Sequence, residues 1–121
     1  MRQRDDNFQI RFRKYKAGEV GISSIAASEL AYGVAKSGSV KNRKALDMFL
    51  APLKILPFDS QCLWFYADLR ASLEKQGLTI GAMDTLIAAH ALSIDGTLVT
   101  NNLKEFARVP KLKLENWFEA I

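Results

Sequence analysis

The sequence predicts an α/β fold in which a short parallel sheet lies between helices, giving three layers. Short apolar segments suited to buried strands alternate with longer segments whose apolar residues have helical spacing. Most helical segments also begin at a Ser, Asp or Asn and end at a Gly or Pro. The chain of 121 residues has no repeat, linker or low-complexity tract, so we expect one domain spanning residues 1–121.

Helices are predicted where apolar spacing is bounded by capping residues. Ser23 or Ser24 caps the second helix, Ser39 the third, and Asp59 or Ser60 the fourth, while Gly38 and Gly77 act as C-terminal stops. The fifth helix is apolar on nearly all sides and should be the buried one. The predicted ranges are 4–16, 24–36, 39–51, 60–76, 83–94 and 102–106.

Four strands are predicted between these helices, at residues 20–22, 53–56, 97–99 and 112–114. The third, Thr97-Leu98-Val99, is the clearest. Parallel strands need right-handed crossovers, and the functional cleft of such a sheet lies beyond the carboxyl ends of its strands. Candidate residues are therefore sought where strands end and helices begin.

Composition is that of an ordinary globular chain, with 49% hydrophobic and 25% charged residues. No apolar run approaches the roughly 20 residues needed to cross a bilayer, and no apolar segment follows the polar start as in a signal peptide. The single cysteine, Cys62, has no partner for an internal disulfide. We expect a cytoplasmic protein with no membrane contact.

Positive charge is concentrated at the start of the chain. The first 16 residues hold six basic and two acidic side chains, whereas the other 105 hold 11 of each. Such a segment either attracts nucleic acid or forms a solubilising helix face.

Glu29 and Asp84 are the candidate carboxylates. Glu29 lies on or beside the apolar face of its helix, where a carboxylate is costly unless it pairs, with Lys36 for example, or binds a metal. Asp84 opens the most apolar helix, and taken alone it is explained best as an ordinary N-cap or first-turn aspartate that the helix dipole favours. If both share a cleft, a divalent cation would relieve their repulsion.

Polar residues follow the third strand as Thr100-Asn101-Asn102. Helix capping explains one asparagine but not the whole run. His90 is the only histidine and lies on a different face of its helix from Asp84, so we expect a packed histidine.

Four ordered motifs between Gly18 and Trp117 resemble VapC-type toxins of the PIN-domain ribonuclease family. They are Ile22-Ser23-Ser24-Ile25 with Ser28-Glu29-Leu30; Leu69-Arg70-Ala71-Ser72-Leu73-Glu74; Ile80-Gly81 with Asp84 and Ile87-Ala88-Ala89-His90-Ala91; and Val99-Thr100-Asn101-Asn102 with Glu105-Phe106.

This resemblance implies a toxin–antitoxin endoribonuclease that hydrolyses RNA with Mg²⁺ or Mn²⁺. It implies catalytic roles for Glu29, Asp84 and Asn102, of which Glu29 and Asp84 hold the metal. Thr100 and Arg70 are the implied substrate-binding residues. The implied partners are RNA and an antitoxin protein.

The chain departs from the family pattern at its start, where the family has a strand ending in its first catalytic aspartate. Asp5 and Asp6 follow no strand and do not replace it. We therefore expect weak metal binding, reduced or absent activity, and a sheet edge covered by a homodimer or a partner.

Two other interpretations stay open at this point. One is a catalytically inactive PIN-like scaffold that binds an antitoxin-like partner or itself. The other is an unrelated nucleic-acid-binding domain that uses Arg2, Arg4, Arg11 and Arg13 and has no need of Glu29.

Overall fold

Capping residues begin and end the helices close to where the sequence predicts them. The hydroxyl of Ser23 accepts the Ile25 N–H and that of Ser39 accepts the Asn42 N–H. Gly38 and Gly77 adopt φ of 66° and 69°, a left-handed conformation that ends a helix and favours glycine.

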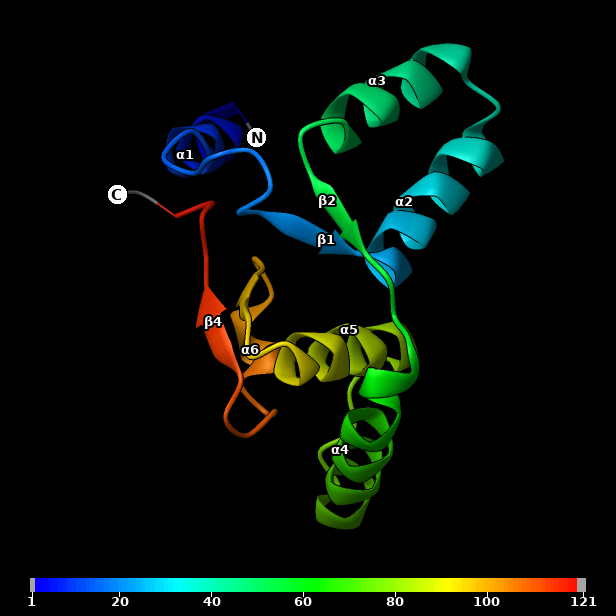
Figure 1. Cartoon of the computed structure of the whole chain (residues 1–121), viewed down its shortest axis with the longest axis vertical. Coiled ribbons are helices and arrows are strands. Elements are labelled where there is room, and N and C mark those ends of the chain that lie inside the picture. The colour runs from blue at the N-terminus through cyan, green and yellow to red at the C-terminus, as the bar shows by residue number, and fades with distance from the viewer. Residues whose placement is uncertain (1, 120–121) are drawn as a thin grey trace. The chain divides into compact units, whose positions relative to one another are not determined.

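The computed structural model describes residues 2–119, except the side chains of Arg2 and Arg4 (Figure 1). Its helices are α1 (Arg2–Phe12), α2 (Ser24–Ser37), α3 (Val40–Leu50), the 3₁₀ helix η1 (Ser60–Cys62), α4 (Leu63–Gln76), α5 (Ala82–Ser93) and α6 (Leu103–Phe106).

The strands form two parallel pairs. They are β1 (Gly21–Ser23), β2 (Lys54–Leu56), β3 (Thr97–Val99) and β4 (Lys113–Glu115). Ile22 is in register with Ile55, and Leu98 with Leu114. The parallel pairing and the α/β class are confirmed. Instead of one continuous ladder, the described residues contain two separate two-stranded ladders, since each strand has three residues and pairs with one neighbour.

The chain divides into two compact units, and one of them contains residues 15–58. In this unit β1 and β2 lie side by side, and α2 and α3 form a helical hairpin (Figure 1). Gly21 permits the close approach of the two strands, because a Cβ there would lie only 2.9 Å from the Lys54 carbonyl oxygen. The Ser24 hydroxyl accepts the Phe58 N–H at 3.0 Å and fixes the end of the unit.

The other unit combines the N-terminal helix with residues 59 onward, and it holds the main core. Helix α4 packs against α5, as predicted for the most apolar helix. Leu98 and Leu114 from the β3–β4 pair pack against the same cluster. The buried core residues are Leu69, Leu73, Ala88, Ala89, Phe106 and Val109.

Helix α1 is attached to the C-terminal segment of the same unit. Phe8 stacks on Phe118 with ring centroids 5.0 Å apart and also contacts Trp117 at 5.5 Å. The Asn7 amide donates to the Phe118 carbonyl at 3.1 Å, and Arg11 donates to the Asn116 carbonyl at 2.8 Å. The basic segment therefore has a structural role through Arg11, whereas Arg13 is exposed and the Arg2 and Arg4 side chains lie outside the described part.

His90 is buried on α5, so the predicted packed histidine is confirmed. Burial lowers its pKa, and the nearby charge of Asp59 opposes that shift only in part. Across residues 2–119, none of the helices combines the length and the apolar character that a membrane span requires.

Candidate metal and RNA site

The first turn of α5 places Asp84 beside a glycine. Gly81 occupies the N-cap position in an extended conformation, and its carbonyl accepts both the N–H and the hydroxyl of Thr85 at 2.9 Å. Because the N-terminal end of a helix carries partial positive charge, it favours a carboxylate in its first turn. Asp84 is half-buried in this first turn.

A second carboxylate, Glu105, joins Asp84 at this helix end. Its Oε1 accepts the Gly81 N–H at 2.9 Å, and its Oε2 accepts the Asn102 side-chain amide at 2.5 Å. A Cβ at Gly81 would lie 3.5 Å from Asp84 Oδ2 and 3.7 Å from Glu105 Oε1, so both carboxyl groups border the same small space.

Hydrogen bonds hold Glu105 in its ionised form. The Gly81 N–H lowers the pKa of Glu105 most, burial opposes this, and Asp84, Asn102 and the charge of Arg108 lower it further. Two neighbouring carboxyl groups either share a proton or bind a cation between them. The pair is therefore a candidate cation site.

Asn102 positions Glu105 and does not cap α6 with its side chain. It occupies the N-cap position of α6, yet its side-chain amide bonds to Glu105 one turn ahead. The Thr100 hydroxyl in turn accepts the Asn102 N–H at 3.0 Å. The structure thus joins the predicted residues Thr100 and Asn102 to the carboxylate pair through Glu105.

Basic side chains line a hollow together with Glu105. A surface hollow of about 330 Å³ is lined by Gly81, Asn102 and Glu105, and also by Lys104 and Arg108. Arg108 donates to the Thr79 carbonyl at 2.8 Å and so fixes the segment that leads to Gly81. Positive charge next to a carboxylate pair suits an anionic substrate that is bound together with a cation.

Glu29 lies on α2 in the unit of residues 15–58, so its proximity to Asp84 stays a prediction. Its side chain is exposed, and the described residues contain no ion pair between it and Lys36. The burial cost expected for this carboxylate is therefore absent, because solvent reaches the side chain.

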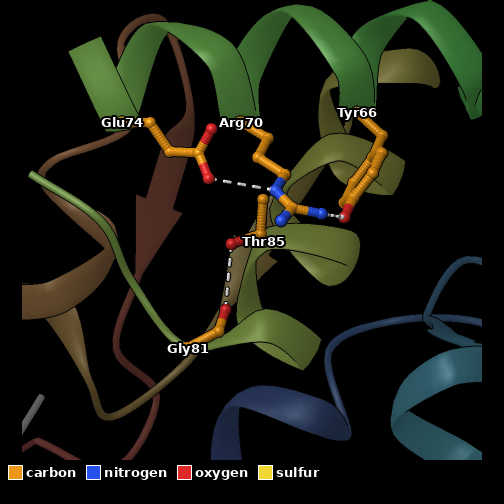
Figure 2. Close-up of polar contacts among 5 residues, drawn as sticks. All are labelled: Tyr66, Arg70, Glu74, Gly81 and Thr85. Carbon is orange, nitrogen blue, oxygen red and sulfur yellow. Dashed lines mark hydrogen bonds and ion pairs between the residues drawn. The ribbon is translucent and has the colours of Figure 1, made fainter.

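Arg70 lies on α4, across a second hollow from the start of α5. Its Nε donates to Glu74 at 3.3 Å, and its Nη1 donates to the Tyr66 hydroxyl at 3.0 Å. Figure 2 shows the guanidinium extending from α4 towards the first turn of α5. Arg70 and Glu74, one turn apart on α4, therefore form an exposed ion pair.

The donor set suits Mg²⁺ or Mn²⁺ better than zinc. Within the described residues, no group of three or more His, Cys, Asp or Glu side chains converges. Mg²⁺ is commonly bound by one or two carboxylates together with waters and substrate phosphates. Asp84 and Glu105 supply two such carboxylates, so the residues present fit an ion of this kind.

Glu105 is the site residue that sequence reasoning missed. It is part of the fourth motif, but the family resemblance implies no catalytic or metal-binding role for it. The available signal was its spacing, since Asn102 and Glu105 are three residues apart and so lie one above the other on a helix. The bond to Gly81, 24 residues away, has no signal in the local pattern.

Comparison with known proteins agrees with this fold. Residues 1–112 match the family model of the PIN domain. The chain is 50% identical over 103 residues to "Ribonuclease VapC2" of Rickettsia felis, covering 84% of this chain and 77% of that protein. It is 39% identical over 97 residues to "tRNA(fMet)-specific endonuclease VapC" of Salmonella typhimurium, covering 79% and 74%.

Solved structures give the same result. A chain in the crystal structure of VapBC2 from Rickettsia felis, bound to a promoter DNA fragment, is 51% identical with a TM-score of 0.76, covering 80% of this chain and 74% of that one. A chain in DNA-bound VapBC from Salmonella typhimurium is 35% identical with a TM-score of 0.85, covering 92% and 84%. The chain belongs to the PIN-domain family and, within it, to the VapC-type proteins.

Proposed function

We propose that the chain is a VapC-type endoribonuclease, the toxin of a toxin–antitoxin pair, which hydrolyses RNA phosphodiester bonds with Mg²⁺ or Mn²⁺. The observation that carries this proposal is the Asp84–Glu105 carboxyl pair beside Gly81, next to a hollow that Glu105 lines together with Lys104 and Arg108. The ribonuclease and tRNA endonuclease names of its relatives support the same substrate class.

The roles of Asp84, Glu105, Asn102 and Thr100 follow from their contacts. Asp84 and Glu105 would hold the ion, and Glu29 is a further proposed carboxylate on the ground of the family resemblance alone. Asn102 orients Glu105 through its side-chain amide, and Thr100 orients Asn102. A bound divalent ion activates water for attack and stabilises the charge that develops at phosphorus.

Cationic side chains would bring the substrate to this pair. Without them, the carboxylates would repel the phosphates of RNA. Lys104 and Arg108 line the same hollow and offset that repulsion. Arg108 is committed in part to the Thr79 carbonyl, so Lys104 is the more adaptable phosphate contact.

We also propose an antitoxin protein as the binding partner and a homodimer as the assembly. The solved relatives are VapBC complexes, some of them bound to DNA. That likeness supports a protein partner for this chain as well.

Cleavage of labelled single-stranded RNA with Mg²⁺ or Mn²⁺ tests the proposal. Asp84→Asn, Glu105→Gln and Glu29→Gln should each lower cleavage at least a hundredfold, because each removes a charge that holds the ion. Asp95→Asn is the matched control, since its carboxylate is 95% exposed and lies on a turn away from the hollow.

Equal cleavage by all of these proteins would place the activity elsewhere. Absence of metal-dependent cleavage by the unmodified chain, with antitoxin binding retained, would favour the inactive scaffold instead.

A further inference from the structure

A second hollow adjoins the carboxylate site, and the proposed function gives it no role. Its volume is about 210 Å³, and α4 contributes Tyr66, Arg70 and Glu74 to its wall. Thr79 and Ile80 line this hollow and also the hollow that contains Glu105. This short segment therefore borders both hollows. A strand of RNA bound beside Glu105 could extend into the hollow beside Arg70.

Arg70 is held in one orientation at this hollow (Figure 2). Glu74 accepts from its Nε at 3.3 Å, and the Tyr66 hydroxyl accepts from its Nη1 at 3.0 Å, which fixes the plane of the guanidinium. The side chain is 59% exposed, so the pairing contributes little to stability. A solvent-facing arginine whose plane is fixed offers a flat surface at a low entropic cost of binding.

The surroundings favour a flat, uncharged ligand over a phosphate. The Glu74 carboxylate balances the charge of Arg70 and would repel an anion. Ile80 and Ala82 supply apolar surface, and the Thr85 hydroxyl is already bonded to the Gly81 carbonyl. Stacking on an arginine plane or an aromatic ring is the usual way in which proteins hold the unpaired bases of RNA.

We propose that this hollow binds a base of the RNA substrate, from a nucleotide next to the cleaved bond, and that the base stacks on the guanidinium of Arg70. The inference rests on the proposed function and adds the feature that selects the substrate. Tyr66 and Glu74 are positioning residues, because they act through Arg70.

RNA binding in the absence of divalent cations tests this inference separately from cleavage. The probes are fluorescent oligoadenylate and an abasic strand of the same length, which carries the same phosphates without bases. For the full chain we expect the base-bearing strand to bind about tenfold tighter, as one stacked base typically contributes.

The variants separate stacking from charge. Arg70→Ala and Arg70→Lys should both reduce the preference for the base-bearing strand over the abasic strand to about twofold or less. The lysine variant keeps the charge but not the flat surface on which a base stacks. Lys75→Ala is the matched control: it removes an exposed cation from the same helix, outside the hollow, and should keep the preference for the base-bearing strand.

Retention of the preference in Arg70→Lys would overturn the inference, as would equal weakening of both strands in Arg70→Ala, which indicates a phosphate contact. If Asp84→Asn abolishes cleavage while the Arg70 variants still bind the base-bearing strand more tightly, the proposed base site is wrong and the nuclease proposal stands. If the base preference depends on Arg70 but the chain shows no metal-dependent cleavage, the base site stands and the nuclease proposal is wrong.

Discussion

Glu105 accepts a hydrogen bond from the backbone N–H of Gly81 at 2.9 Å, although 24 residues separate the two in the sequence. This bond connects the short helix after β3 to the start of the central helix α5. It lies at the centre of the proposed site, because it brings the Glu105 carboxylate to the helix end that carries Asp84.

The lowered pKa of Glu105 should make stability depend on acid pH. The Gly81 N–H favours the ionised carboxylate in the folded chain, so this contribution is complete above the ordinary carboxyl value of 4.5. It is lost as the pH falls from there through the lowered pKa of the folded state. Urea denaturation between pH 3 and 7 should show a steeper acid loss for the unmodified chain than for Glu105→Gln. Identical profiles would mean that the bond does not favour the ionised form.

Asn102→Asp should make folding depend on a divalent ion. The substitution replaces the amide that donates to Glu105 with a carboxylate, and like charges in contact destabilise the folded chain. Thermal unfolding without metal should therefore occur at a lower temperature than for the unmodified chain, and Mn²⁺ should recover most of the difference. The same loss in Asn101→Asp, where the side chain is exposed and has no such bond, would show that the effect is not specific to the site.

His90 should produce a second pH dependence at higher pH. Burial lowers its pKa in the folded chain, so the unfolded chain binds the proton more readily. Stability is then complete above the ordinary histidine value of 6.5 and decreases as the pH falls below it. In His90→Gln this decrease should disappear, as measured by urea midpoints from pH 5 to 8. A midpoint of the unmodified chain that stays constant across this range would contradict the expectation.

Two leucines near the end of α4 separate core packing from surface effects. Leu73 is 2% exposed and packs in the main cluster, whereas Leu78 is 38% exposed. Leu73→Ala should lower the free energy of unfolding by about 2–5 kcal/mol, because it leaves a cavity. Leu78→Ala should cost well under half of that, as measured by urea denaturation. Equal losses would mean that the cluster around α4 and α5 does not dominate stability.

Most of the secondary structure could be predicted because its signals are local. Ser23, Ser39, Gly38 and Gly77 determine where helices begin and end through bonds to residues two to four positions away. Strand pairing is harder to predict from the sequence, because the register of Leu98 with Leu114 is set by a crossover between distant segments and not by neighbouring residues. The division into two separate parallel pairs had no local signal either.

The candidate site could be anticipated in part for the same reason. Asp84, Thr100 and Asn102 each follow a strand or open a helix, where side chains of an α/β fold meet, and their catalytic roles stay a prediction. The position of Glu105 could not be anticipated, because it depends on the long-range bond to Gly81. Glu29 was correctly placed on a helix, but its burial was overestimated from the apolar residues around it.

The most direct test of the account is a titration of the chain with Mn²⁺, in which the free ion is followed by electron paramagnetic resonance. We predict that the unmodified chain binds the ion, and that Asp84→Asn and Glu105→Gln each weaken binding by at least about tenfold, since ligand environments of this kind are sensitive to single changes. Asp95→Asn should bind like the unmodified chain. Affinity for Mn²⁺ that is equal in all four proteins would contradict the assignment of Asp84 and Glu105 as the metal site.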